Sequence, residues 1–191
     1  MNIGLFGGSF NPIHNGHVWL AKALLLRAGL DEVWFMVSPQ NPLKQNRQLL
    51  DDGLRFRMVQ LALADEPWLR PCDYEFRLPK PSYTWNTLQS LKNDYPEHRF
   101  TLLIGGDNWQ LFDQWYRHED IVREYPIVVY PRQDAGAETL KADTPNVTFV
   151  KVPLINISST MIRERLKQGK SVRGLVPGRV ASVIEQEHLY G

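Results

Sequence analysis

The chain has 191 residues, 43% of them apolar and 23% charged, with a formal net charge of +1 at pH 7. This length fits one domain over residues 1–191 with a core large enough to fold without a metal or disulfide. The near-neutral charge gives no support for a nucleic-acid-binding face, and the single cysteine excludes an intrachain disulfide and a cysteine-rich zinc site. Because we find neither a secretory leader nor an apolar run of ~20 residues, we expect a cytoplasmic protein without a membrane partner.

The predicted elements alternate between short apolar strands and amphipathic helices. In chain order, we predict a strand at 2–6, a helix at 16–28, a strand at 32–38, a helix at 54–64, a strand at 70–76, a helix at 84–93, strands at 100–104, 126–130 and 147–152, and helices at 159–168 and 177–188. The helix at 54–64 should bury Leu54, Met58, Leu61 and Ala62. This order predicts an α/β fold, a doubly wound and mostly parallel sheet, whose ligands lie beyond the carboxyl ends of the strands.

The turn after the first strand, GGSFNPIHNGH over residues 7–17, has the features of a phosphate site. Its glycines allow a ligand to approach the backbone closely, and the following helix offers free N–H groups. His14 and His17 stand at the helix entrance, where both imidazoles can face one anion, and Gly16 keeps the turn open. The simpler alternative is a tight turn with surface or capping histidines. A metal site is disfavoured because no cysteine or nearby carboxylate completes a ligand set.

These residues resemble a known family. GSFNP at 8–12 running into HNGH at 14–17 is similar to the signature of the His-x-Gly-His nucleotidyltransferase superfamily. ISSTMIR at 157–163, where Ser159 or Thr160 can cap a helix, resembles a motif of nicotinate-nucleotide adenylyltransferases; alone it would be an ordinary cap with a solvated arginine. Further similarity lies in PSYT at 81–84, IGGD at 104–107, WY at 115–116 and the ending HLYG. The resemblance covers nearly the whole chain and implies a Rossmann-like nucleotidyltransferase fold.

The resemblance also implies a reaction: ATP and nicotinate mononucleotide give deamido-NAD and pyrophosphate, a step of NAD biosynthesis. The implied catalytic residues are His14, His17, Lys44 and Arg163, with His17 the best placed to stabilise the transition state. The implied ATP-binding residues are Gly8, Ser9, Phe10, Gly105, Asp107, Ser159 and Thr160. The implied substrate-binding residues are Tyr83, Thr84, Trp115, Tyr116 and Arg132. Mg²⁺ is expected to bridge phosphate oxygens, without a dedicated protein metal site.

The sequence departs from the family pattern at three positions and leaves two alternatives open. Asn11 and Asn86 replace aspartates and Leu43 replaces a histidine, which affects individual loop contacts more than the reaction class. A preference for nicotinamide mononucleotide is one alternative, because the choice between acid and amide can depend on backbone N–H groups. A non-catalytic nucleotide sensor is the other. A homo-oligomer is compatible with the sequence but not indicated by it.

Overall fold

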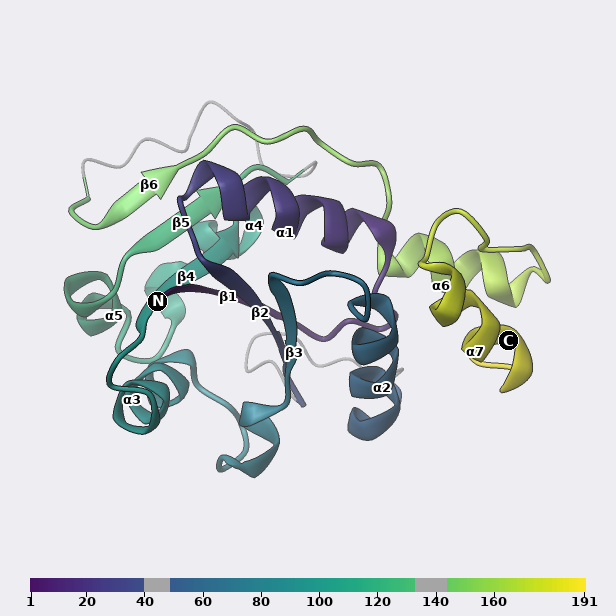
Figure 1. The fold of residues 1–191 in the computed structure, drawn as a ribbon, viewed down its shortest axis with the longest axis horizontal. Helices are drawn as coiled ribbons and strands as arrows, with labels where there is room; N and C mark the ends of the chain where they lie inside the picture. The colour runs from purple at the N-terminus through teal and green to yellow at the C-terminus, as the bar shows by residue number, and fades with distance from the viewer. Residues whose placement is uncertain (40–48, 133–143) are drawn as a thin grey trace.

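The computed structural model describes residues 1–39, 49–132 and 144–191. A six-stranded sheet crosses the molecule in the order β3-β2-β1-β4-β5-β6 (Figure 1). The strands are β1 (Asn2–Gly8), β2 (Glu32–Val37), β3 (Leu69–Cys72), β4 (Arg99–Gly105), β5 (Ile127–Tyr130) and β6 (Val147–Phe149). Every neighbouring pair is parallel. The expectation of a doubly wound parallel sheet is therefore confirmed.

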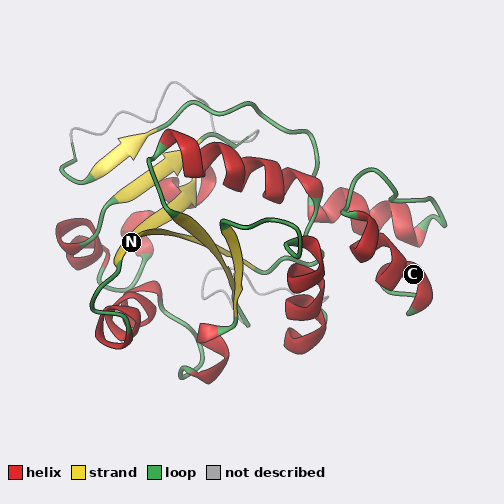
Figure 2. Cartoon of the chain, in the orientation of Figure 1, coloured by secondary structure: helices red, strands yellow, loops and turns green. Residues whose placement is uncertain are grey.

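Helices cover both faces of the sheet (Figure 2). The helices are α1 (Asn15–Arg27), α2 (Asp52–Ala62), α3 (Thr84–Asp94), α4 (Gly106–Gln110), α5 (His118–Glu124), α6 (Ser159–Lys167) and α7 (Gly178–Gln186). Successive strand residues point to opposite faces, so Phe6 packs with α1, α2, α6 and α7, whereas Leu5 packs with α3 and α5. No helix within the described residues is both long and apolar enough to cross a membrane.

The topology places a crevice at the carboxyl ends of β1 and β4. These two strands are neighbours, yet the chain leaves β1 for α1 on one face of the sheet. It leaves β4 for α4, which is followed by α5 on the other face. At such a switch point the two departing loops separate and leave room for a ligand.

Several predicted elements differ from the structure. The strand predicted at 70–76 ends at Cys72, and Tyr74–Arg77 forms a 3₁₀ helix, η1. Pro71 lies within β3, which is tolerated because β3 is an edge strand. The edge strand predicted at 147–152 is only three residues long. The helices α4 and α5 were not predicted, because five to seven residues are too few to display a helical period.

The buried face of α2 agrees with the predicted one only in part, at Met58. Its buried side chains are Arg55, Met58 and Val59, whereas Leu54, Leu61 and Ala62 are only partly buried. The fully buried Arg55 explains the difference, because an apolar pattern assigns an arginine to the solvent side.

Candidate active site

A cavity of about 770 Å³ opens at the carboxyl ends of the strands. Its described lining includes these predicted site residues: Gly8, Ser9, Phe10, His14, His17, Tyr83, Thr84, Asp107, Trp115, Tyr116, Arg132, Ser159, Thr160 and Arg163. Lys44 and Leu43 lie outside the described residues. Segments from both ends and the middle of the chain thus meet around one cavity of the size that small-molecule sites have.

Gly105 lies behind this lining. A Cβ atom at this position would stand 2.6 Å from Asp107 Oδ1 and 2.8 Å from Arg132 Cγ. A larger residue at this position would displace one or both of these side chains, so glycine allows Asp107 and Arg132 to approach each other at the end of β4.

His14 and His17 cap the helix α1 reciprocally. The backbone N–H of His17 donates to His14 Nδ1 at 3.3 Å, and the backbone N–H of His14 donates to His17 Nδ1 at 3.1 Å. A neutral imidazole whose Nδ1 accepts must carry its proton on Nε2. Both rings therefore retain an Nε2–H donor, and no described residue accepts from either one. The alternative of capping histidines is thus confirmed. The phosphate-site hypothesis stays a prediction, and both residues line the cavity as it requires.

The surroundings of the two imidazoles favour their neutral form. Burial, together with the positive charge of Arg132, lowers the pKa of His14 to about 3. Burial also lowers the pKa of His17 well below its ordinary value, and His14 and Arg132 add to this effect. The rings are stacked with their centroids 3.6 Å apart, so protonating both would place two cations in contact.

Gly16 makes room for this pair. It lies in the first turn of α1, and a Cβ atom there would stand 2.9 Å from two atoms of the His14 ring. The glycine thus leaves room for the imidazole to lie over the first turn of the helix.

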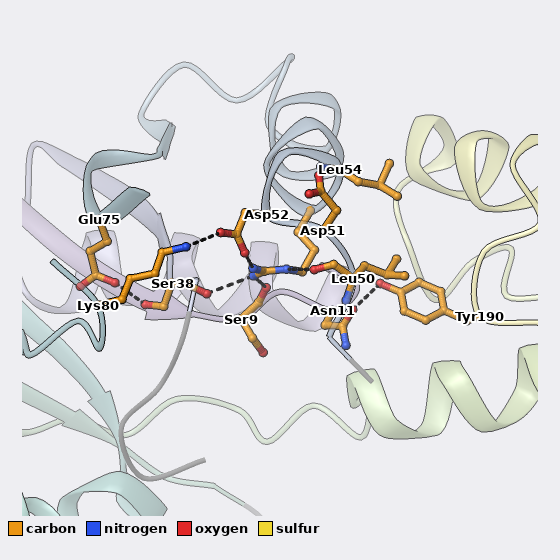
Figure 3. A network of polar contacts seen from close by, with 11 residues as sticks. Ser9, Asn11, Ser38, Leu50, Asp51, Asp52, Leu54, Glu75, Lys80 and Tyr190 are labelled. Atoms are coloured by element: carbon orange, nitrogen blue, oxygen red, sulfur yellow. Dashed lines mark hydrogen bonds and ion pairs between the residues drawn. The ribbon is translucent and has the colours of Figure 1, made fainter. Parts of the chain in front are cut away.

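Arg55 ties the turn at residues 7–17, the predicted phosphate loop, to the neighbouring strand and helix, and sequence analysis did not identify it. Its guanidinium donates to the carbonyl oxygens of Ser9 at 2.6 Å, Ser38 at 3.1 Å and Leu50 at 2.9 Å, and to Asp52 Oδ1 at 2.5 Å (Figure 3). Burial lowers the pKa of Arg55, an effect that Asp52 opposes. The arginine is fully buried, so these bonds fix the end of β1 against the end of β2.

Glu75 is a second residue that sequence analysis missed. This carboxylate lines the cavity and accepts hydrogen bonds from Ser38 Oγ at 2.6 Å and Thr87 Oγ1 at 2.8 Å. Burial raises its pKa, although both hydroxyl donors oppose the shift. The bonds join β2, η1 and α3 at the cavity floor. Neither Arg55 nor Glu75 stands in a recognisable motif, so only the three-dimensional contacts reveal them.

The start of α6 closes the other side of the cavity. Arg163 Nη1 donates to the Asn11 carbonyl at 2.8 Å, and Ser159 Oγ donates to the Pro12 carbonyl at 2.8 Å. Tyr190 Oη donates to Asn11 Oδ1 at 2.8 Å (Figure 3). Ser158 rather than Ser159 or Thr160 caps α6, which corrects the predicted cap. The helix α6 is therefore attached directly to the phosphate loop.

The opposite wall carries the predicted substrate residues. Arg132 Nε lies 4.0 Å from Asp107 Oδ1, and the Tyr83 and Tyr116 rings meet with centroids 5.2 Å apart. Trp115 rests against Phe112, and its buried Nε1–H has no acceptor among the described residues. Within those residues no group of three His, Cys, Asp or Glu side chains is placed to hold a metal ion.

Comparison with known proteins places this site in a family. Residues 5–165 match the family model described as cytidylyltransferase-like. The chain is 47% identical over 190 residues to a probable nicotinate-nucleotide adenylyltransferase of Cytophaga hutchinsonii, covering 100% of this chain and 98% of that protein. It is 49% identical over 184 residues to one of Bacteroides fragilis, covering 96% and 91%. The chain belongs to the nicotinate-nucleotide adenylyltransferase family.

Solved structures agree with the fold of this adenylyltransferase family member. The crystal structure of a protein of Vibrio parahaemolyticus, described as a putative nicotinate-nucleotide adenylyltransferase, has a TM-score of 0.72 at 24% identity, covering 99% of this chain and 94% of that one. The nicotinic acid mononucleotide adenylyltransferase of Plasmodium falciparum, complexed with NaAD, has a TM-score of 0.79 at 20% identity, with 99% and 97% covered. The resemblance drawn from the short motifs is thus confirmed over the full length of the chain.

Proposed function

We propose that the chain transfers the adenylyl group of ATP to nicotinate mononucleotide and releases pyrophosphate. The observation that carries the proposal is one cavity that joins the paired Nε2–H donors of His14 and His17 with Arg163 and the Thr84, Trp115 and Tyr116 wall. Membership of a family of adenylyltransferases supports the reaction class.

The reaction needs alignment and charge stabilisation more than acid–base chemistry. A phosphate oxygen of the mononucleotide attacks the α-phosphorus of ATP and forms the new P–O bond. The P–O bond between the α-phosphorus and the bridging oxygen then breaks, and pyrophosphate leaves with the electron pair. Because the attacking phosphate is already anionic near neutral pH, no general base is required.

We assign the histidines to the ATP phosphates. As neutral Nε2–H donors at the start of α1, they add hydrogen bonds at the place where the helix N-terminus already favours an anion. His17 is the proposed transition-state donor, and Arg163 is proposed to neutralise the outer phosphates. Ser9, Thr160 and the Gly8–Phe10 backbone complete the ATP side. Lys44 remains a predicted phosphate contact.

Mg²⁺ is proposed to enter with ATP and to neutralise its phosphate oxygens. The described residues suit this arrangement, because the cavity wall offers the carboxylates of Asp107 and Glu75 without a clustered ligand set. Phosphate oxygens would then supply most of the ligands.

The acceptor, nicotinate mononucleotide, is proposed to bind against the wall of the cavity that lies opposite α6. Trp115 offers a ring face for the pyridine, Thr84 and Tyr116 offer N–H and hydroxyl donors for its carboxylate, and Arg132 faces its phosphate. Asp107 is proposed to accept hydrogen bonds from ribose hydroxyls. The cytoplasmic location, a homo-oligomeric state and the absence of a nucleic-acid partner remain predictions.

The test is pyrophosphate release with ATP, Mg²⁺ and either nicotinate or nicotinamide mononucleotide at matched concentrations. We expect kcat/KM to be at least about 100-fold higher for the acid than for the amide. The reason is that donors placed for the carboxylate would be left without a partner when the amide binds. A higher value for the amide would keep adenylyl transfer and reject the substrate. Release with neither would favour a nucleotide sensor.

A further inference from the structure

The proposed pyridine wall is formed by two segments, residues 83–85 and residues 115–117. These segments make two contacts with each other. On the cavity side, the Tyr83 ring, just before α3, meets the Tyr116 ring at a centroid distance of 5.2 Å. Behind the wall, the Arg117 guanidinium lies 4.5 Å over the centre of the Trp85 ring. These contacts bracket Thr84. The distance between Thr84 and Tyr116 is therefore held from both sides.

Arg117 has an uncommon backbone conformation. Its φ of 55° and ψ of 37° lie in the left-handed region, which is unfavourable for a residue with a Cβ atom and persists only where the surroundings impose it. Two anchors hold its side chain. One is the Trp85 ring, and the other is Asp120, which accepts from Arg117 Nε at 2.6 Å. Arg117 is the N-cap of α5 and directly follows Tyr116, so the anchors also restrain the Trp115–Tyr116 backbone.

The Trp85 platform is rigid, whereas Arg117 is not needed for the core. Trp85 is 7% exposed and belongs to the core between the sheet and α3, with Tyr125 of the α5 end at an edge-to-face distance of 6.4 Å. The Arg117 side chain is 46% exposed, and neither residue is among the described lining of the cavity. Loss of the Arg117 side chain should thus move the wall without unfolding the chain.

We propose that Arg117 is a positioning residue for the proposed reaction. Its contact with the Trp85 ring, called the clasp below, fixes the Trp115–Tyr116 segment against Thr84. This position of the segment sets the discrimination between the acid and the amide of the pyridine ring. This inference rests on the proposed function. An aromatic ring and a planar guanidinium make a contact that lysine reproduces poorly, so the identity of the side chain matters.

The test compares Arg117→Met and Arg117→Gly with a matched control, Arg123→Met. Arg123 forms an ion pair with Asp120, the carboxylate that Arg117 also contacts, and no described contact joins Arg123 to Trp85. We expect both Arg117 variants to raise KM for nicotinate mononucleotide about tenfold and to lower the acid-to-amide ratio of kcat/KM about tenfold, with KM for ATP changed less than about twofold. Glycine adopts the left-handed conformation freely, so its variant separates the loss of the clasp from backbone strain. The control should behave as wild type.

Trp85→Leu combined with Arg117→Met should lower the acid-to-amide ratio no further than Arg117→Met does alone, because the two side chains act through one contact. Unchanged discrimination in Arg117→Gly, or an equal loss in Arg123→Met, would overturn the proposal while the wild-type activity stands. A wild-type chain that converts neither mononucleotide would instead reject the proposed function and this inference with it.

Discussion

His14 and His17 cap the helix α1 and are the proposed donors to the ligand. Each Nδ1 accepts the backbone N–H of the other residue, which leaves the Nε2–H group of each ring available to a ligand in the cavity that both residues line. Hydrogen bonds from preorganised donors to developing negative charge are among the largest contributions to catalysis. The reciprocal capping therefore gives the pair a fixed orientation that two surface histidines would lack.

Replacement of His17 with alanine should lower kcat about 100-fold and change KM for ATP less than about threefold, because the lost donor acts mainly on the transition state. Steady-state pyrophosphate release measures both constants. His188→Asn serves as the control, since His188 is exposed and asparagine tolerates its positive φ. An unchanged kcat in His17→Ala would remove this residue from the mechanism.

The buried His14 makes folding stability dependent on pH. Its pKa in the folded chain is about 3, against an ordinary value of 6.5. Between these two pH values the unfolded chain therefore binds the proton more readily than the folded chain does. Stability is thus fully present above pH 6.5 and falls, by about 1.4 kcal/mol per pH unit from this group, as the pH decreases toward 3. Urea unfolding of His14→Asn, which keeps a capping side chain, should show a shallower decline between pH 6.5 and pH 4. Parallel curves for the two proteins would contradict this account.

At the scale of elements, Arg55 of α2 connects the ends of β1 and β2. Three backbone carbonyls depend on one guanidinium that has no access to solvent. A buried acceptor that loses its donor costs about 1–3 kcal/mol. Arg55 therefore holds the shape of the phosphate loop, although its own side chain is not among the described lining of the cavity.

Replacement of Arg55 with methionine should lower the free energy of unfolding by about 3–5 kcal/mol, and replacement with lysine by somewhat less, since an ammonium reaches fewer of the carbonyls. Arg57→Met is the control on the same helix, because the contact of Arg57 within the described part of the chain is an exposed ion pair with Glu187, and its loss should cost less than about 1 kcal/mol. Urea denaturation gives all three values. Equal losses for Arg55→Met and Arg57→Met would exclude the proposed tie.

Sequence patterns predicted the elements with local signals and missed those that depend on distant contacts. The turn at Gly8–His17 combines glycines, histidines and a helix start within ten residues, so its role could be inferred. Arg55 was not identified because its partners Ser9 and Ser38 are remote in sequence. Short helices such as α4 lack a period, and Ser158 was passed over because capping depends on where the helix begins.

At the scale of the molecule, the C-terminal segment completes the site formed by the N-terminal turn. Tyr190 and Asn11 are separated by 179 positions yet share a hydrogen bond, and Arg163 donates to the same asparagine's carbonyl. Motif similarity at both ends suggested a shared site, but only the fold shows that α6, α7 and the first loop are one unit. The single domain over residues 1–191 remains a prediction.

Replacement of Tyr190 with phenylalanine should raise KM for ATP about threefold and lower the free energy of unfolding by about 1 kcal/mol, because Asn11 loses one hydrogen-bond donor. Tyr74→Phe is the matched control: its hydroxyl donates to Asp94 on the other side of the sheet, so only stability should change. Steady-state kinetics and urea unfolding of both variants separate the two effects. An equal rise in KM for ATP in Tyr190→Phe and Tyr74→Phe would contradict a specific link between the C-terminus and the phosphate loop.

The most direct test of adenylyl transfer uses ATP labelled with ³²P at the α-phosphorus, together with Mg²⁺ and nicotinate mononucleotide. Bond cleavage between the α-phosphorus and the bridging oxygen predicts that all transferred label appears in the dinucleotide and none in the released pyrophosphate. Label that remains in ATP, or that appears as AMP or ADP without a dinucleotide, would contradict the account.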